Sequence, residues 1–391
     1  MKCIVQKFGG SSIATVDRIK NISKIIIETY DKGLNVVVVV SAQGNTTNQL
    51  IEKMETVNKE SSKREMDMLI SVGEQISISL LASYINSLGY PAISLTGWQA
   101  GIYTNNIYNN ARIIYIDNKR ILKELNERKI VIVAGFQGID KNNNITTLGR
   151  GGSDTSAVAL AISLNASVCQ IFTDVDGVYT ADPRLVKDAK KIDEITFDEM
   201  LEMASLGAKV LHNRSVELAK KNNLEIDVRS SFNNKPGTKV KEEISLEKQP
   251  IRGITSDDDI LLVQTEKTIN NIYEMMLKLK ENNIIISGIS LSGIDNENKI
   301  CFLTKKNQKK TIDKLFNKET LDYIDNVTKI SIIGSGLMSN NILLKLFEIF
   351  LVNEIKPYLI LTGEITVSLV VNKKLEEKLI NILHQEYKRG C

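Results

Sequence analysis

The stretch Val36–Leu50, VVVVVSAQGNTTNQL, decides the fold class of this 391-residue chain. A continuous β-branched run over Val36–Ser41 is typical of a parallel strand that is covered on both faces, because such a strand exposes neither face to water. Ligands in open α/β folds bind at the carboxyl ends of the strands, so the hydroxyl-rich segment Ser41–Thr47 is a candidate binding loop. The turn-forming character of Ser, Asn and Thr explains the same residues nearly as well.

Outward from this stretch, strand and helix patterns alternate up to about residue 245. Alternation of this kind predicts parallel strands joined by right-handed crossovers, and therefore an α/β domain. Further strands are expected at Cys3–Lys7, Ile130–Ala134 and Val168–Thr173. Helices are expected from Ser12 to about Tyr30 and at Met66–Leu88, Asn118–Glu127, Thr155–Leu164, Asp198–Met203 and Val210–Asn222.

A domain boundary is predicted where the turn-rich segment Phe232–Thr238 meets the charged stretch Lys239–Lys248. Residues 1–245 then form one domain and residues 246–391 a second. The second contains a weak repeat in which a strand, an amphipathic helix and two strands recur after roughly 70 residues, as duplicated modules do. The modules are expected at about 250–325 and 326–391, with interleaving allowed. Their strands are expected at Ile260–Gln264, Lys299–Thr304, Lys329–Gly334 and Glu364–Val371.

Composition restricts the function classes. The net charge is only +3, with acidic and basic residues interspersed, so no basic face for nucleic acid is expected. The four cysteines include no C-x-x-C pair, which favours a reducing cytoplasm over a disulfide framework. The N-terminus lacks a signal-peptide pattern, and the longest aliphatic run is too short to span a bilayer. We therefore expect a cytoplasmic protein that binds neither membrane nor nucleic acid.

The stretch KFGGSS at Lys7 follows the first strand directly. Glycines let main-chain N–H groups approach a ligand, and a helix N-terminus carries partial positive charge. Lys7 with Gly9 and Gly10 is therefore a candidate phosphate cradle, while a strand-to-helix turn capped by serine is the alternative. It is not a P-loop, because G-x-x-x-x-G-K-[ST] is absent.

Two further stretches carry ionisable side chains. In GRGGSDTSA at Gly149, Arg150 can hold a carboxylate with two hydrogen bonds, and Asp154 can cap the helix or hold Mg²⁺ or another cation. In SVGEQIS at Ser71, Gly73 costs about 1 kcal/mol relative to alanine inside a helix, which indicates a close approach. Glu74 can accept a hydrogen bond from a substrate ammonium, and a solvated surface glutamate is the alternative.

The stretch TDVDGVYTADPR at Thr173 combines an Asp-Gly turn with Tyr179, which can flank a base, and Arg184, which can reach a phosphate. A solvated acidic loop is the alternative. Together these stretches suit one nucleotide and one small anionic substrate. The chain has two histidines, His212 and His384, and neither lies in these stretches, so Ser-His-Asp chemistry has little support.

Six motifs together resemble the aspartate kinases of the amino acid kinase superfamily. The resemblance covers the whole chain, because aspartate kinases carry two C-terminal ACT modules where the repeat lies. It implies a mainly parallel sheet sandwiched by helices and followed by two βαββ ferredoxin-like ACT modules. The motifs are KFGGSS at Lys7, SAQGNTTNQL at Ser41, SVGEQIS at Ser71, GRGGSDTSA at Gly149, FTDVDGVYTADPR at Phe172 and GAKVLH at Gly207.

The resemblance implies Mg-ATP-dependent phosphorylation of the β-carboxylate of L-aspartate, the first step toward lysine, threonine and methionine. It assigns Lys7 to the transferring phosphoryl group and Asp154 to the organisation of Lys7 and the metal-bound phosphates. Substrate contacts are implied for Ser41, Thr47, Glu74, Arg150, Gly151, Gly152 and Ser153. ATP contacts are implied for Lys7, Phe8, Gly9, Gly10, Ser11, Thr173, Asp174, Tyr179, Arg184 and Lys209. No resident metal site is predicted.

The chemistry agrees with the absence of a catalytic histidine. A carboxylate is already ionised at pH 7, so phosphoryl transfer to it needs positioning and charge neutralisation and no general base. The resemblance also implies a homodimer or higher oligomer through the ACT modules and a lysine or threonine effector. The first module lacks the glycine-containing turn of the family at Glu266–Ile269, so the effector stays open. A kinase acting on glutamate or acetylglutamate and a non-catalytic amino-acid sensor are the alternatives.

Overall fold

The computed structural model describes residues 2–208, 210–233, 235–242, 251–266, 269–292, 299–316, 321–334, 337 and 340–389. They form two compact units. The first unit contains residues up to Val178, Lys191–Ala204 and Lys209–Leu246, and the second contains Tyr179–Lys190, Ser205–Ala208 and Glu247–Cys391. The sequence did not indicate that Tyr179–Lys190 and Ser205–Ala208 group with the second unit.

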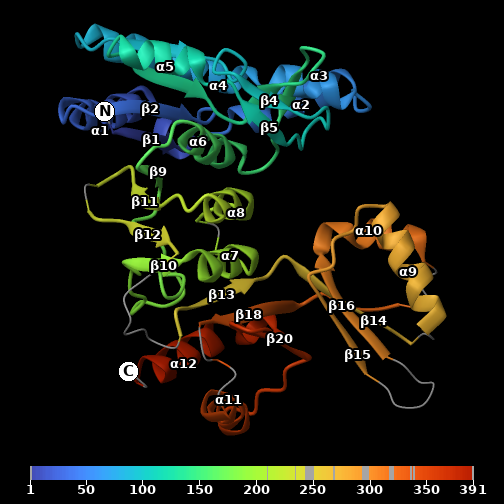
Figure 1. Ribbon diagram of the computed structural model, residues 1–391. Coiled ribbons are helices and arrows are strands. Elements are labelled where there is room, and N and C mark those ends of the chain that lie inside the picture. Colours follow the sequence, from blue (N-terminus) through green and yellow to red (C-terminus); the bar gives the residue numbers. More distant parts are fainter. Residues whose placement is uncertain are drawn as a thin grey trace. The chain divides into compact units, whose positions relative to one another are not determined.

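The first unit is built on an eight-stranded sheet with the order β10-β12-β11-β9-β1-β2-β6-β3, most of which can be followed in Figure 1. All neighbouring strands are parallel except β11 and β12. The five valines of β2 are at most 1% exposed, which confirms the predicted strand covered on both faces. The strands are β1 (Cys3–Phe8), β2 (Asn35–Val40), β3 (Ala92–Leu95), β6 (Ile130–Ala134), β9 (Val168–Thr173), β10 (Glu194–Thr196), β11 (Ile226–Ser230) and β12 (Thr238–Lys241).

Helices cover both faces of this sheet. Helices α1 (Val16–Asp31) and α4 (Val72–Ser87) share a hydrophobic core with alternate residues of β2 and β6. Helix α6 (Gly152–Ser163) packs on β1, β2 and β9, and α8 (Asn213–Lys221) packs against α6. The other helices are η1 (Gly10–Ile13), α2 (Thr46–Val57), α3 (Lys63–Ile70), α5 (Lys119–Asn126) and α7 (Phe197–Ser205).

Helices α3 and α4 form one nearly continuous run, Lys63–Ser87, where a single helix was predicted. Among the described residues it is the one helical run long and apolar enough, by length and composition, to cross a membrane. Half of its most apolar window is buried inside the protein, and Ile78, Leu81 and Ile85 lie in the core beside α1. These are features of a core helix in a globular domain.

A small sheet with the order β5-β4-β7-β8 also belongs to the first unit and was not predicted. Its last strand leads directly into the Gly149–Asp154 stretch. The strands are β4 (Ile102–Thr104), β5 (Ile113–Ile116), β7 (Gln137–Ile139) and β8 (Ile145–Thr147).

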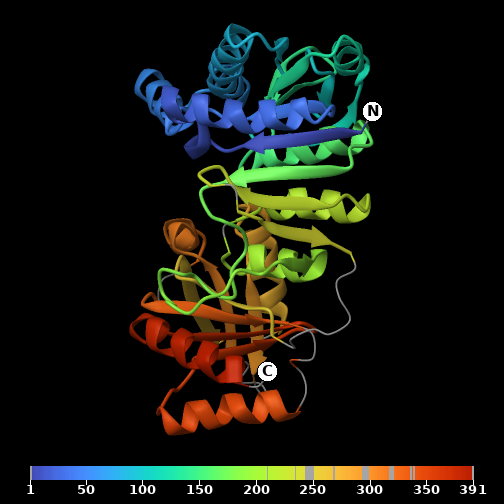
Figure 2. The ribbon, with the colours of Figure 1, turned by 90° about the vertical axis from the view of Figure 1, so that its left-hand side faces the viewer.

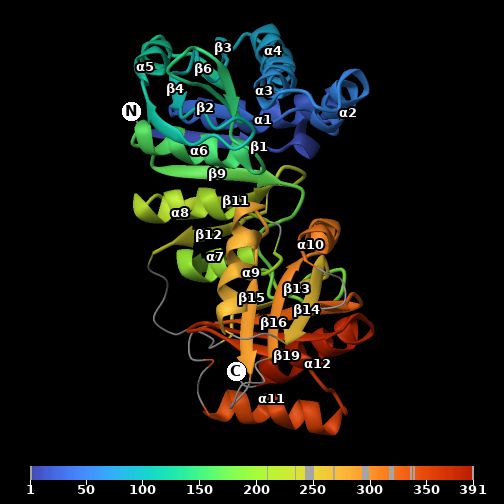
Figure 3. The ribbon, with the colours of Figure 1, turned by 90° about the vertical axis from the view of Figure 1, so that its right-hand side faces the viewer.

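The second unit contains two antiparallel four-stranded sheets, with the orders β15-β16-β14-β17 and β13-β18-β20-β19. The strands of the first module, numbered in chain order, have the order 2-3-1-4 of a ferredoxin-like fold, and the second sheet has the same arrangement with β13 in the place of the fourth strand. The predicted βαββ modules are thus confirmed, and each is extended by one helix and one strand. The first module contains β14 (Ile260–Glu266), α9 (Ile269–Glu281), β15 (Gly288–Ser292), β16 (Lys299–Lys305), η2 (Lys306–Gln308), α10 (Lys309–Leu315) and β17 (Asp322–Ile324) (Figure 3).

The second module is interleaved with the first. Its edge strand β13 (Gly253–Asp257) precedes the whole first module in sequence and pairs with β18. Helices α11 and α12 pack in one hydrophobic cluster against its sheet (Figure 2). The module further contains β18 (Val327–Ile333), α11 (Asn340–Val352), β19 (Leu359–Thr362), β20 (Thr366–Asn372), η4 (Lys373–Leu375) and α12 (Glu376–Arg389).

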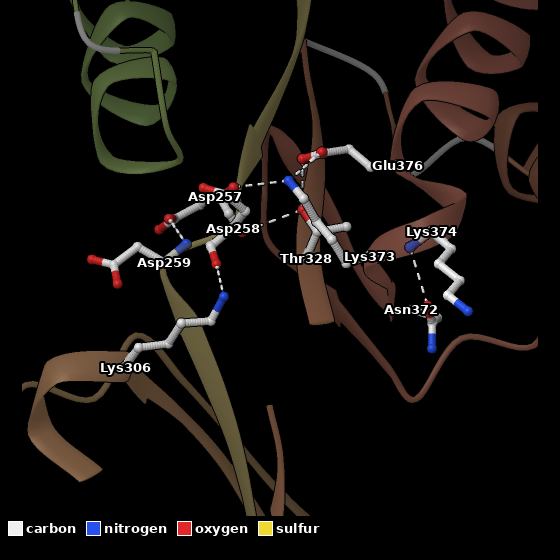
Figure 4. Close-up of polar contacts among 9 residues, drawn as sticks. All are labelled: Asp257, Asp258, Asp259, Lys306, Thr328, Asn372, Lys373, Lys374 and Glu376. Carbon is white, nitrogen blue, oxygen red and sulfur yellow. Dashed lines mark hydrogen bonds and ion pairs between the residues drawn. The ribbon is translucent and has the colours of Figure 1, made fainter. Parts of the chain in front are cut away.

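The turn between β13 and β14 is held by charged side chains from both modules (Figure 4). Lys306 of the first module donates a hydrogen bond to the Asp258 carbonyl oxygen. Lys373 of the second module pairs with the Asp258 carboxylate at 2.8 Å and with Glu376. Thr328 donates a hydrogen bond to Glu376 at 2.9 Å. This turn is therefore a point where the two modules share polar contacts.

Candidate active site

A cavity of about 260 Å³ lies beyond the carboxyl ends of β1 and β2, at the start of α6. Four of the stretches singled out in the sequence contribute to it, although they are far apart in the chain. A loop at the carboxyl edge of a parallel sheet is where such folds bind ligands. The lining residues are Lys7, Gly10, Ser41, Ala42, Gly44, Thr47, Glu74, Phe136, Gly149, Arg150, Gly151, Gly152, Ser153 and Asp154.

Lys7 and Asp154 form an ion pair inside this cavity. Their Nζ and Oδ1 atoms are 2.6 Å apart, and the side chains are 11% and 12% exposed. Lys7 projects from β1, the strand between β2 and β9, and Asp154 lies in the first turn of α6. Asp154 is not the N-cap of α6, because that position is occupied by Gly151, which has no side chain to cap the helix. The capping alternative is therefore wrong, and the carboxylate instead holds the lysine.

Glycines bring the loops around this pair close together. A side chain at Gly10 would place its Cβ 2.8 Å from the Ala42 carbonyl oxygen, and the Gly10 carbonyl accepts a hydrogen bond from Gly44 N at 3.1 Å. A Cβ at Gly152 would lie 2.8 Å from the ring of Phe136. These close approaches exclude any larger residue at the two positions, so both glycines line the cavity of Lys7 without side chains.

Glu74 lies in the first turn of α4 and is 3% exposed, so the surface-glutamate alternative is wrong. Its Oε1 accepts a hydrogen bond from Ala42 N at 2.9 Å, while Oε2 is buried without a hydrogen-bond partner. Burial raises the pKa of Glu74 to about 8. Buried polar atoms are almost always paired, so Oε2 is an exception and is able to accept a hydrogen bond from a ligand. Gly73 permits this placement, because a Cβ there would lie 2.7 Å from the Ala42 side chain.

The Gly149–Ser153 stretch also lines the cavity. Gly149 and Gly151 have φ angles of 78° and 69°, a left-handed conformation that favours glycine on each side of Arg150. Arg150 is exposed and Ser153 is buried. The lining of the cavity therefore includes an arginine and a buried carboxylate, groups that can hold the carboxylate and the ammonium of an amino acid.

The residues predicted to bind the nucleotide are brought together only in part. Gly10 lines the cavity and Ser11 is exposed on η1. The Phe8 ring is buried and stacks on Phe172 at 4.6 Å, so Phe8 can offer only its main chain. Thr173 ends β9, beside β1, and donates a hydrogen bond to Asp174 at 3.0 Å.

The other residues predicted to bind the nucleotide either group with the second unit or are not among the described residues. Tyr179 and Arg184 group with the second unit, where Arg184 pairs with Asp182 at 2.6 Å. Lys209 lies outside the described residues. In the part of the chain that the structure describes, no group of three or more His, Cys, Asp or Glu residues could hold a metal ion.

Sequence reasoning missed Ala42, Gly44 and Phe136 as individual site residues. Phe136 has a φ angle of 67° and follows β6 in the stretch AGFQG. That stretch could have been found, because a glycine-bearing loop after a buried strand was the signal used elsewhere. The Ala42 amide that holds Glu74 left no signal, since a main-chain donor has no side-chain signature.

Comparison with known proteins gives a consistent result. Residues 2–230 match the amino acid kinase family. An aspartokinase of Bacillus sp. (strain MGA3) is 46% identical, over 99% of this chain and 97% of its own. The fold resembles E. coli aspartokinase III in complex with aspartate and ADP, with a TM-score of 0.82, 24% identity, and coverage of 98% of this chain and 99% of that one. The same E. coli enzyme in complex with lysine and aspartate gives a TM-score of 0.79, again at 24% identity and with the same coverage.

Proposed function

We propose, since this chain belongs to the aspartokinases of the amino acid kinase family, that it transfers the γ-phosphoryl group of Mg-ATP to the β-carboxylate of L-aspartate. The products are 4-phospho-L-aspartate and ADP. The bond formed joins a β-carboxylate oxygen to the γ-phosphorus, and the bond broken joins that phosphorus to the oxygen bridging to the β-phosphate. No proton has to be removed, because the carboxylate is ionised at neutral pH.

The observation that carries this proposal is the buried Oε2 of Glu74, which has no partner and lines the same cavity as Lys7 and Arg150. An α-ammonium group would satisfy that oxygen, and Arg150 would hold the α-carboxylate. These two contacts would leave the β-carboxylate free to approach Lys7. Ser41, Thr47, Gly151, Gly152 and Ser153 would complete the contacts to aspartate.

Lys7 would stabilise the negative charge on the transferring phosphoryl group. A fixed cation in a partly desolvated site is effective because it needs no reorganisation during the reaction. Asp154 would keep the ammonium of Lys7 in place and help to organise the metal-bound phosphates. The Mg²⁺ would arrive with ATP and neutralise phosphate charge.

The nucleotide would extend from Lys7 toward the end of β9. Main-chain groups of Phe8, Gly9, Gly10 and Ser11 would line the phosphates. The remaining ATP contacts would come from Thr173, Asp174, Tyr179, Arg184 and Lys209.

The second unit would bind an amino-acid effector. Its two ferredoxin-like modules suit feedback control by lysine or threonine, the end products of the pathway that aspartate phosphorylation begins. The modules would also join two chains into a homodimer or higher oligomer. We place the enzyme in the cytoplasm, where ATP and aspartate are available and where the free thiols of Cys3, Cys169 and Cys301 stay reduced.

The test is ADP release from Mg-ATP in the presence of L-aspartate, with hydroxylamine to trap the acyl phosphate as a hydroxamate. L-Glutamate and N-acetylglutamate are assayed in parallel. Aspartate-dependent hydroxamate supports the proposal, whereas turnover of glutamate or acetylglutamate alone would show a different amino acid kinase. A folded protein that binds ATP and phosphorylates none of them would be a sensor. Inhibition by lysine or threonine would identify the effector.

A further inference from the structure

Asp67 of α3 is a buried carboxylate that does not line the cavity, and it accepts hydrogen bonds from Thr147 and Asn109. Its side chain is 0% exposed. Oδ2 accepts a hydrogen bond from Thr147 N at 2.8 Å, and Oδ1 accepts one from the Thr147 hydroxyl at 2.7 Å. Asn109 N donates to both oxygens, at 3.0 Å from each. Burying a carboxylate is costly unless it is fully hydrogen-bonded, so this residue has a specific structural task.

These contacts link two segments that line the cavity. Asp67 lies on the same helical run as Glu74, because α3 continues into α4 through Ser71 alone. Thr147 ends β8, and the chain then enters the loop that carries Arg150. Asn109 touches the same loop, since a Cβ at Gly149 would lie 2.8 Å from the Asn109 carbonyl oxygen. Asp67 therefore ties the helix of Glu74 to the loop of Arg150.

A separate contact holds the loop of Arg150 from its other side. Arg214 of α8 donates hydrogen bonds to the Leu148 carbonyl at 3.0 Å and to the Ala111 carbonyl at 2.8 Å. Leu148 N also donates to the Phe136 carbonyl at 2.8 Å. Gln137, which pairs with Thr147 across β7 and β8, also donates a hydrogen bond to the Ser71 carbonyl at 2.7 Å. Without Asp67 the loop would keep this one link to the start of α4 and lose the links made through Thr147 and Asn109.

We propose that Asp67 is a positioning residue that sets the spacing between Glu74 and Arg150, and so determines the affinity of the site for an α-amino acid. This inference rests on the proposed function, in which Glu74 holds the substrate ammonium and Arg150 the α-carboxylate. Asp67 itself touches neither substrate nor nucleotide. Its loss should weaken the binding of aspartate and leave ATP binding unchanged, because the phosphate cradle around Lys7 makes no contact with it.

The test is Asp67→Asn in the full chain, assayed by coupled ADP release with each substrate varied in turn. The NH₂ group of the asparagine would face a main-chain N–H, which is also a donor. The variant would therefore lose a hydrogen bond from Thr147 or from Asn109. We expect the KM for aspartate to rise by about tenfold or more, while the KM for ATP stays within about twofold of wild type. Thr147→Val removes only the hydroxyl contact, so it should shift the KM for aspartate in the same direction by less.

Asp140→Ala is the matched control. Asp140 is also buried and accepts hydrogen bonds from Asn142 N at 2.8 Å and Asn144 N at 2.9 Å, at the end of the β7–β8 hairpin away from Thr147. It also accepts a longer hydrogen bond, of 3.4 Å, from the Tyr108 hydroxyl, which involves that side chain and not the main chain that leads to Asn109. Its loss should lower the Tm without changing the KM for aspartate, because general destabilisation reduces the amount of active enzyme and not its affinity.

The outcomes separate this inference from the proposed function. A wild-type KM for aspartate in both Asp67→Asn and Thr147→Val would overturn the positioning role, as would an equal rise of that KM in Asp140→Ala. If Asp67→Asn does not fold, Thr147→Val carries the test alone. A wild-type protein that does not turn over aspartate would instead refute the proposed function.

Discussion

Two lysine–aspartate pairs in this protein have the same chemistry and different surroundings. Lys7 and Asp154 are 11% and 12% exposed, whereas Lys373 and Asp258 are 34% and 59% exposed. In the second unit Lys373 also pairs with Glu376, and the Asp258 carbonyl is held by Lys306, as Figure 4 shows. That group of charges is satisfied within the protein. The Lys7 pair faces a cavity instead, where main-chain groups of Gly10 and Gly152 leave space for a ligand.

The difference shows how to separate a pair kept for chemistry from a pair kept for structure. An exposed ion pair contributes at most about 1 kcal/mol to stability, and a buried pair is often no better than two apolar residues. Stability is therefore a poor reason for burying Lys7 and Asp154. Their position in a cavity at the carboxyl end of the central strands, where folds of this kind bind ligands, gives the better reason.

The largest expected effect comes from breaking the cavity pair. Lys7→Ala and Asp154→Asn should each lower kcat by about 10³-fold or more, because removal of one fixed electrostatic contact to a transition state costs about 10²–10³ and Asp154 also orients Lys7. The fold should persist, since cavity water can reach the remaining charge. Steady-state ADP release gives kcat, and far-UV circular dichroism checks the fold. Near-wild-type turnover in either variant would contradict the roles assigned to the pair.

A smaller, pH-dependent effect is expected at Glu74. Burial raises the pKa of Glu74 to about 8, so at pH 7 the ligand-free site is mostly protonated. An ionised carboxylate is needed to hold an ammonium, so the KM for aspartate should fall by about tenfold between pH 7 and pH 9. Glu74→Gln should raise this KM and remove its pH dependence. A wild-type KM that does not vary with pH, or an equal slope in Glu74→Gln, would argue against the contact.

The same pKa shift predicts the sign of a stability change. Between the ordinary glutamate pKa of about 4.3 and the raised value, the folded protein keeps a proton that the unfolded chain has released. The free energy of unfolding of ligand-free protein should therefore fall as the pH rises through that window. Thermal unfolding of wild type and Glu74→Gln across pH 5–9 measures it, and the difference between them should shrink toward pH 5.

Much of the fold and half of the site follow from local patterns. The valine run of β2 and its neighbours predicted a parallel sheet covered on both faces. The stretches at Lys7, Ser41, Ser71 and Gly149 were placed together because strand ends of a parallel sheet meet at one edge. The helical run that carries Glu74 was predicted with nearly its observed length.

The rest depends on contacts that no local pattern encodes. Helix α2 begins with Thr46 and Thr47, residues that suit a helix N-terminus and a turn equally well. Strand β13 pairs with β18 across the whole first module, so its partner could not be read from its neighbours in sequence. Ala181 and Val186 join the core of the second unit, which separates their loop from the stretch that precedes it.

The smallest expected effect comes from breaking the exposed pair. Lys373→Ala should lower the free energy of unfolding by about 1 kcal/mol, because Asp258 is 59% exposed and screened by water and salt. Glu376, which is 11% exposed, loses Lys373 but keeps the hydrogen bond from Thr328. Activity without an effector should not change. Lys374→Ala is the matched control, since it removes the same charge from the next residue, whose side chain is exposed and points away from Asp258 in Figure 4.

The pH dependence of that pair has the opposite sign to that of Glu74. The hydrogen bond from Lys373 holds the pKa of Asp258 below its ordinary value. As the pH falls, the carboxylate of Asp258 therefore stays ionised in the folded protein after it has taken up a proton in the unfolded chain. The contribution of the pair to the free energy of unfolding is present above the ordinary aspartate pKa and is lost as the pH falls through the lowered pKa. The Tm difference between Lys373→Ala and Lys374→Ala should thus be small at pH 7, smaller in high salt, and absent in acid. A large Tm difference that persists in high salt would mean that Lys373 holds the two modules together by more than an exposed ion pair. The two pairs would then differ in their access to a ligand and not in their contribution to stability.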